Sequence, residues 1–71
     1  MTEYVVRLQF TADGPLVSGT WQVLPSADRT YRNWVALYGN HLTAVITLLE
    51  DQHGEERVMK RWSLAEGEQY E

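Results

Sequence analysis

A chain of 71 residues without cysteine fits one small domain and excludes both a disulfide framework and a thiolate metal site. The formal net charge is −4, yet Glu66, Glu68 and Glu71 lie at the C-terminal end and leave seven acidic and six basic residues elsewhere, so the charge balance does not favour nucleic acid or anionic lipid. The first residues lack a basic start with an apolar core, and no apolar run reaches the roughly 20 residues that span a bilayer. We therefore expect a cytoplasmic protein without a membrane segment.

The chain opens with a predicted β-hairpin. Apolar and polar residues alternate over residues 4–10 and again over residues 17–23, which is the period of a half-buried strand. A four-residue loop, 12–15, fits between them better than a two-residue turn, because its proline has no N–H to close a tight turn. This loop pairs Phe10 with Val17 and gathers most apolar residues of the hairpin on one face.

A helix is predicted to follow the hairpin. Ser26 is a suitable N-cap for a helix over residues 27–38, and Gly39 is a suitable C′ residue. The apolar residues recur at helical spacing and form one stripe, which we expect to pack on the apolar face of the hairpin. The sequence leaves open whether the aromatic members of this stripe lie only in the core or border a ligand pocket. The stripe consists of Ala27, Tyr31, Trp34, Val35 and Tyr38.

The most apolar run, residues 42–49, is predicted to be the central strand, because it is rich in β-branched residues and has apolar side chains on both parities. A continued helix over residues 42–51 is the alternative, but the preceding Gly-Asn pair and the β-branched residues argue against it. Residues 57–62 form the next strand if His53-Gly54 makes the turn. The resulting register sets Glu50 opposite Arg57, Leu49 opposite Val58 and Val45 opposite Trp62.

The order of these elements, ββαββ, predicts an α+β fold. We expect a four-stranded antiparallel sheet with the strand order 2-1-3-4 and the helix packed on one face. The alternative order, 1-2-4-3, leaves the most apolar strand at an edge of the sheet. We expect residues 1–63 to form this single domain and residues 64–71 to form an acidic, flexible C-terminal tail.

The second hairpin is predicted to carry the function. It presents apolar residues on both faces, and one helix covers only one of them, so the other is an apolar patch rimmed by charge, which is typical of a protein contact. In the alternative interpretation, the stems of Lys60 and Arg61 cover this patch in a monomer. We expect a small non-enzymatic interaction or accessory module that forms a homodimer or binds another protein. The residues expected to bind the partner are Val45, Thr47, Leu49, Val58, Lys60 and Trp62.

Weak binding of single-stranded nucleic acid is the alternative function. Basic side chains neutralise phosphates and bases stack on aromatic rings. The candidate residues are Arg57, Lys60, Arg61 and Trp62. Strand alternation argues against this function, because Arg57 and Arg61 share one face whereas Lys60 and Trp62 share the other.

The sequence contains no recognisable catalytic constellation. The serines have no motif context, and neither histidine is tied by a signature to a nucleophile. Asp51, His53 and Glu55 alternate around a turn and offer metal-ligating atoms, but acidic turns of this kind are usually solvated loops. We therefore expect no enzymatic activity, no cofactor and no metal.

Overall fold

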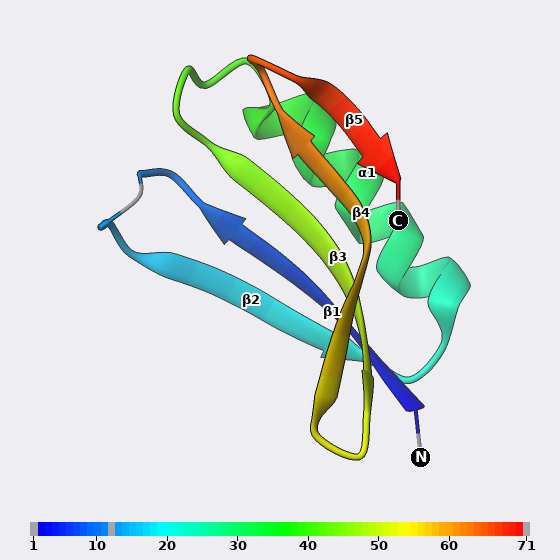
Figure 1. The fold of residues 1–71 in the computed structure, drawn as a ribbon. Coiled ribbons are helices and arrows are strands. Elements are labelled where there is room, and N and C mark those ends of the chain that lie inside the picture. The colour runs from blue at the N-terminus through cyan, green and yellow to red at the C-terminus, as the bar shows by residue number, and fades with distance from the viewer. Residues whose placement is uncertain (1, 12, 71) are drawn as a thin grey trace.

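The computed structural model describes residues 2–11 and 13–70 and shows an α+β fold, in which a helix packs on one face of an antiparallel sheet of five strands (Figure 1). The strand order is β2-β1-β3-β4-β5, so the predicted order 2-1-3-4 is confirmed and the predicted number of strands is wrong. Met1, Ala12 of the expected loop and Glu71 of the expected tail lie outside the described residues. The elements are β1 (Thr2–Gln9), β2 (Leu16–Trp21), α1 (Leu24–Tyr38), β3 (Val45–Gln52), β4 (Glu55–Ser63) and β5 (Gly67–Tyr70).

The fifth strand, β5, lies in the segment that we expected to be a flexible tail. Gly67 has φ 72°, a left-handed conformation that suits glycine, and it follows a loop of three residues that reverses the chain after Ser63. The chain then pairs antiparallel with β4, and Tyr70 lies opposite Lys60. The acidic composition of the C-terminal segment does not reveal this turn. The strand β5 forms one edge of the sheet.

The first hairpin has the predicted faces but a longer loop. Val17 pairs with Leu8 rather than with Phe10, a shift of two residues from the expected register. Because side chains alternate with a period of two, this shift keeps every side chain on the predicted face of the sheet. The hairpin therefore still presents one apolar face to the helix.

The helix begins earlier than its predicted N-cap. Val23 occupies the N-cap position in an extended conformation without a side-chain hydrogen bond, and a proline lies in the first turn, where its missing N–H has no consequence. Ser26 is thus inside the helix, and its carbonyl accepts a hydrogen bond from the Thr30 hydroxyl. Gly39 ends the helix with φ −64°, a right-handed conformation, so it is not the left-handed C′ residue that we expected.

The second hairpin turns where the sequence predicts. His53 and Gly54 have φ 56° and 87°, as a tight two-residue hairpin turn requires, and the predicted pairs Glu50–Arg57 and Leu49–Val58 are confirmed. A β-bulge then shifts the register between Leu48 and Leu49, where β4 contains one extra residue, Met59. As a result, Val45 faces Ser63 and Ile46 faces Trp62, so the predicted Val45–Trp62 pair is wrong.

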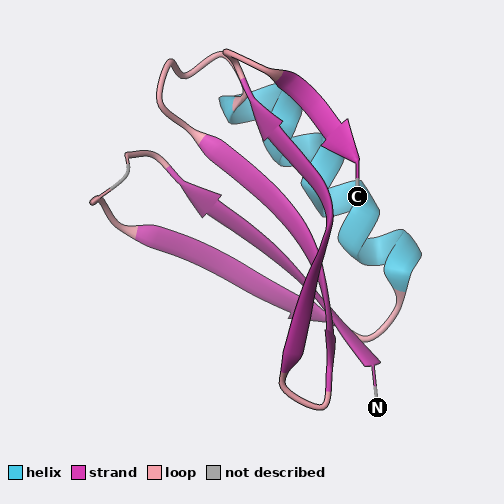
Figure 2. Ribbon diagram, in the orientation of Figure 1, coloured by secondary structure: helices cyan, strands magenta, loops and turns pink. Residues whose placement is uncertain are grey.

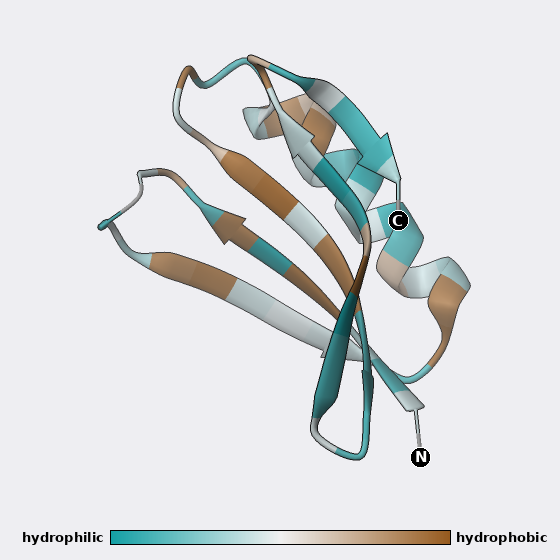
Figure 3. Ribbon diagram, in the orientation of Figure 1, coloured by the Kyte–Doolittle hydropathy of each residue, from teal (hydrophilic) through white to brown (hydrophobic). Residues whose placement is uncertain are grey.

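The core lies between α1 and the middle of the sheet. Figure 2 shows the helix crossing one face of the strands, and Figure 3 shows hydrophobic stretches along β1, along β3 and at the start of β2. The strands β1 and β3, the helix and Ala44 just before β3 supply the buried side chains of the core. The buried core cluster consists of Val6, Leu8, Ala27, Tyr31, Ala44, Ile46 and Leu48.

Candidate binding groove

The structure divides the expected partner-binding residues between the two faces of the sheet. Val45, Thr47, Leu49 and Val58 lie on the open face, away from the helix, as expected. Lys60 and Trp62 lie on the helix face, because the bulge at Met59 moves every later residue of β4 to the opposite side. The six residues therefore do not form one surface.

The open face exposes less apolar surface than the sequence indicates. Leu49, at its centre, is only 5% exposed although no helix covers it. Arg7 of β1 forms an ion pair with Glu56 of β4 across the intervening strand, with an N–O distance of 3.0 Å. The β3 residues that face these two partners flank Leu49, so the long Arg7 side chain crosses the strand there. The stem that shields Leu49 is thus that of Arg7, and of the two stems expected to cover this patch, that of Arg61 lies on the open face and that of Lys60 points to the other face.

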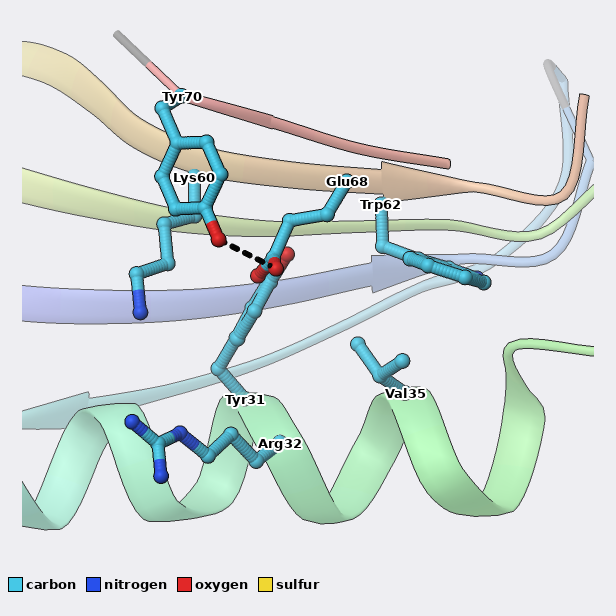
Figure 4. A pocket seen from close by; sticks show the side chains of 7 residues that line it. All are labelled: Tyr31, Arg32, Val35, Lys60, Trp62, Glu68 and Tyr70. Atoms are coloured by element: carbon cyan, nitrogen blue, oxygen red, sulfur yellow. Dashed lines mark hydrogen bonds between the residues drawn. The ribbon is translucent and has the colours of Figure 1, made fainter. Parts of the chain in front are cut away.

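A groove lies on the helix side of the second hairpin. The helix packs mainly against β1 and β3, so β4 and β5 extend beside it and their helix-facing side chains line a cavity of about 330 Å³ (Figure 4). This cavity, the α1–β5 groove, combines aromatic rings with charges of both signs. It is lined by Tyr31, Arg32, Val35, Lys60, Trp62, Glu68 and Tyr70.

Trp62 closes one end of the α1–β5 groove against the end of the helix. Its indole nitrogen donates a hydrogen bond of 3.0 Å to the carbonyl oxygen of Gly39. A Cβ atom at Gly39 would lie 2.7 Å from that nitrogen, which is too close for any side chain. Glycine is therefore required here for space and not for its backbone conformation.

Lys60 lies at the middle of the helix-facing side of β4. Its ammonium group is 2.8 Å from a carboxylate oxygen of Asp28 and 5.8 and 5.9 Å from the ring centroids of Tyr31 and Tyr70. These distances allow an ion pair and two cation–π contacts. Beyond Lys60 lies a second, mostly apolar hollow of about 360 Å³, lined by Leu24, Pro25, Asp28, Leu48, Met59 and Lys60.

Tyr31 brings a buried polar atom to the base of the α1–β5 groove. The residue is 1% exposed, and its hydroxyl forms no full hydrogen bond within the described residues. In Figure 4 the hydroxyl points toward the carboxylate of Glu68, which accepts a hydrogen bond of 2.8 Å from the Tyr70 hydroxyl. Burial raises the pKa of Tyr31 far above its usual value, and the negative charge of the nearby Glu68 carboxylate and a hydrogen-bond interaction with it raise this pKa further. The Tyr31 hydroxyl therefore stays neutral and is able to donate.

The residues expected to bind nucleic acid are separated in space. Arg57 lies 3.7 Å from a carboxylate oxygen of Glu50, and Lys60 is held by Asp28. Arg61 lies on the open face beside a shallow hollow, whereas Trp62 faces the helix. These positive charges and the ring therefore form no single strip along which a phosphate backbone could run.

The turn considered for metal binding, which contains Asp51, His53 and Glu55, is stabilised by a hydrogen bond. A carboxylate oxygen of Asp51 accepts a hydrogen bond of 3.0 Å from the main-chain N–H of Gly54. Within residues 2–11 and 13–70, no group of three His, Cys, Asp or Glu side chains is arranged to hold a metal ion. In the same residues, no helix is long and apolar enough to cross a membrane.

The aromatic stripe of the helix serves two regions. Tyr31 belongs to the core and to the groove, whereas Tyr38 is 38% exposed and packs its ring edge-on against Phe10, with 5.6 Å between centroids.

Glu68 and Tyr70 of the groove were not predicted from the sequence because β5 was not predicted. Gly67 was the available signal, since a glycine that follows a three-residue loop after a strand often ends a hairpin loop. No protein-family model, curated protein or solved structure matches this chain.

Proposed function

We propose that this chain is a small non-enzymatic interaction module that binds a segment of a partner protein beside its second hairpin, in the α1–β5 groove. The Tyr31 hydroxyl is the observation that carries this proposal, because it is buried at the base of an open groove and the Glu68 carboxylate beside it forms no full hydrogen bond with it. An unsatisfied buried polar group costs about 1–3 kcal/mol of stability. A bound group that accepts a hydrogen bond from Tyr31 would recover part of this cost.

The chemistry of the groove favours a polypeptide ligand. The Tyr31 hydroxyl is a neutral donor, and the Glu68 carboxylate beside it is an acceptor. A peptide group, or the side-chain amide of Asn or Gln, matches both, because its C=O accepts and its N–H donates. A phosphodiester, in contrast, has no hydrogen-bond donor for Glu68.

The rim of the groove supplies the apolar contacts of such a complex. Tyr70 is 70% exposed at the edge of the sheet, and Trp62 is held in place by its hydrogen bond to Gly39. Tyrosine and tryptophan are among the residue types that dominate binding energy at protein interfaces. The bound segment is therefore expected to place an apolar side chain against these rings and a peptide group over Tyr31.

A displayed library of random linear peptides tests this proposal. Peptides enriched on the native protein are expected to bind the Tyr70→Ala variant at least about tenfold more weakly, the loss typical of a removed aromatic anchor. Leu42→Ser is the matched control, because Leu42 is 79% exposed and does not line the groove, so this variant should keep full affinity.

Two results would contradict the proposal. One is that no peptide sequence is enriched, and the other is that the enriched peptides bind the Tyr70→Ala variant as tightly as the native protein. Titration with oligothymidine at low salt tests the alternative function, which is the binding of single-stranded nucleic acid. Tight binding that weakens with added salt would favour nucleic acid over a peptide ligand.

A further inference from the structure

The strand β2 forms the edge of the sheet opposite β5. It pairs with β1 on one side, and within the described residues no strand pairs with its other side. At every second residue of such an edge, the main-chain N–H and C=O groups point outward and are free to pair with another strand. Leu16 and Val17, on opposite faces of β2, are 52% and 46% exposed. An added strand would therefore cover apolar surface on both faces.

The charge distribution favours a second copy of this chain as the occupant of this edge. Residues 14–27, which contain β2 and its flanks, include no charged residue, although the chain as a whole has a net charge of −4. Natural edge strands commonly carry charges that prevent pairing with another copy, and β2 has none. The opposite edge has this protection, because Glu68 lies in β5 and Glu66 just before it.

We propose that two copies pair antiparallel through β2, around a two-fold axis perpendicular to the sheet at Gly19. In this register, Val17 of one copy lies opposite Trp21 of the other, and Gly19 of one copy lies opposite Gly19 of the other. Gly19 suits the axis because the Trp21 ring already lies over it: a Cβ atom at Gly19 would be 2.5 Å from that ring. The glycine thus makes room for the two Trp21 rings, one from each copy, which meet at the axis.

The paired strands would join two sheets into one continuous sheet, with both helices on the same face. Because β2 and β5 lie at opposite edges of each sheet, the α1–β5 groove of each copy would stay open at the far end of the dimer. The dimer is inferred from β2 alone and does not depend on what the groove binds. It would, however, present two grooves to a partner and strengthen binding to a partner with two matching segments.

Two double variants of exposed residues test both the interface and its register. On the open face, Ser18 of one copy lies opposite Thr20 of the other in the register centred on Gly19. The variant Ser18→Lys with Thr20→Lys sets lysines against each other and is expected to weaken dimerisation at least about a hundredfold. The variant Ser18→Lys with Thr20→Glu sets each lysine against a glutamate and should remain dimeric. Gln69→Lys, at the opposite edge, is the control and should also remain dimeric.

Light scattering gives the molecular mass of each variant, and circular dichroism verifies that it is folded. The native protein is expected to have the mass of a dimer, and a monomer at concentrations up to about 1 mM would overturn the proposal. A dimeric lysine–lysine variant would also overturn it. If that variant fails to fold, amide hydrogen exchange of the native protein decides: exchange in β2 should slow as concentration rises, and unchanged exchange in β2 refutes the interface.

Discussion

The indole nitrogen of Trp62 donates a hydrogen bond of 3.0 Å to the carbonyl oxygen of Gly39, and this bond joins β4 to the end of the helix. The same glycine leaves no room for a side chain, since a Cβ atom would lie 2.3 Å from the carbonyl oxygen of Val35 and 2.7 Å from the indole nitrogen. A substitution at Gly39 is therefore expected to disturb both the last turn of α1 and the position of Trp62 at the end of β4.

Replacing Gly39 with alanine should lower the free energy of unfolding by about 1–3 kcal/mol, the usual cost of forcing extra atoms into a packed site. Urea denaturation measures the loss. The Trp62→Phe variant removes the indole N–H and narrows the ring, so the alanine should cost less in that background than in the native protein. Equal costs in both backgrounds would show that Gly39 and Trp62 are not coupled.

The ion pairs of Lys60 and Arg57 should differ in strength. The Lys60 and Asp28 side chains are 24% and 20% exposed and 2.8 Å apart, whereas Arg57 is 61% exposed and 3.7 Å from Glu50. Lys60→Met should therefore destabilise the protein by about 1 kcal/mol, a figure that already allows for partial solvent screening. Arg57→Met should change the stability by less than about 0.5 kcal/mol. Urea denaturation compares the two, and equal losses would contradict the predicted difference.

Tyr31 should make the protein less stable at high pH. Its pKa is raised in the folded protein by burial and by Glu68, whereas an unfolded tyrosine has a pKa near about 10. Above that pH the unfolded chain loses a proton that the folded chain keeps, so the free energy of unfolding falls as pH rises, while below it Tyr31 contributes no pH dependence. Urea denaturation at several pH values should show that the free energy of unfolding falls less steeply with pH in the Tyr31→Phe variant. An equally steep fall in the variant would show that Tyr31 is not its source.

The same substitution has a second expected result at neutral pH. The Tyr31 hydroxyl makes no full hydrogen bond within the described residues, so its removal takes away a desolvated polar group and should leave stability unchanged or raise it by up to about 1 kcal/mol. Tyr38→Phe, at a partly exposed ring, is the matched control and should be neutral. A loss of stability specific to Tyr31→Phe would show that the hydroxyl has a partner in solution.

Patterns with a short period predicted most of the fold. Alternation gave the faces of the first hairpin even though its register was two residues away, because an even shift leaves every side chain on its own face. The positive-φ turn at His53-Gly54 similarly fixed two pairs of the second hairpin. These features depend on neighbouring residues, so they can be recognised in the sequence.

The groove could not be predicted because it depends on two features without a periodic signal. A bulge adds one residue and reverses the faces of Lys60 and Trp62, yet alternation along β4 does not show where the extra residue lies. The strand β5 is stabilised by its pairing with β4, and its own residues are too few and too polar to indicate a strand. The site is therefore set by tertiary pairing.

Deleting Met59 should remove the bulge and preserve the rest of the register. The pairs Leu49–Val58 and Leu48–Lys60 flank the bulge, so without Met59 they become consecutive and Trp62 still faces the helix. The deletion should cost about 1–3 kcal/mol, because Met59 packs partly against the core. Deleting Arg61 is the matched comparison: it would turn Trp62 to the open face and should cost more than about 3 kcal/mol, since the ring and its hydrogen bond leave the helix side. Nuclear Overhauser contacts between Trp62 and Gly39 should persist only in the first variant, and their loss on deleting Met59 would show that Met59 is not the extra residue of the bulge.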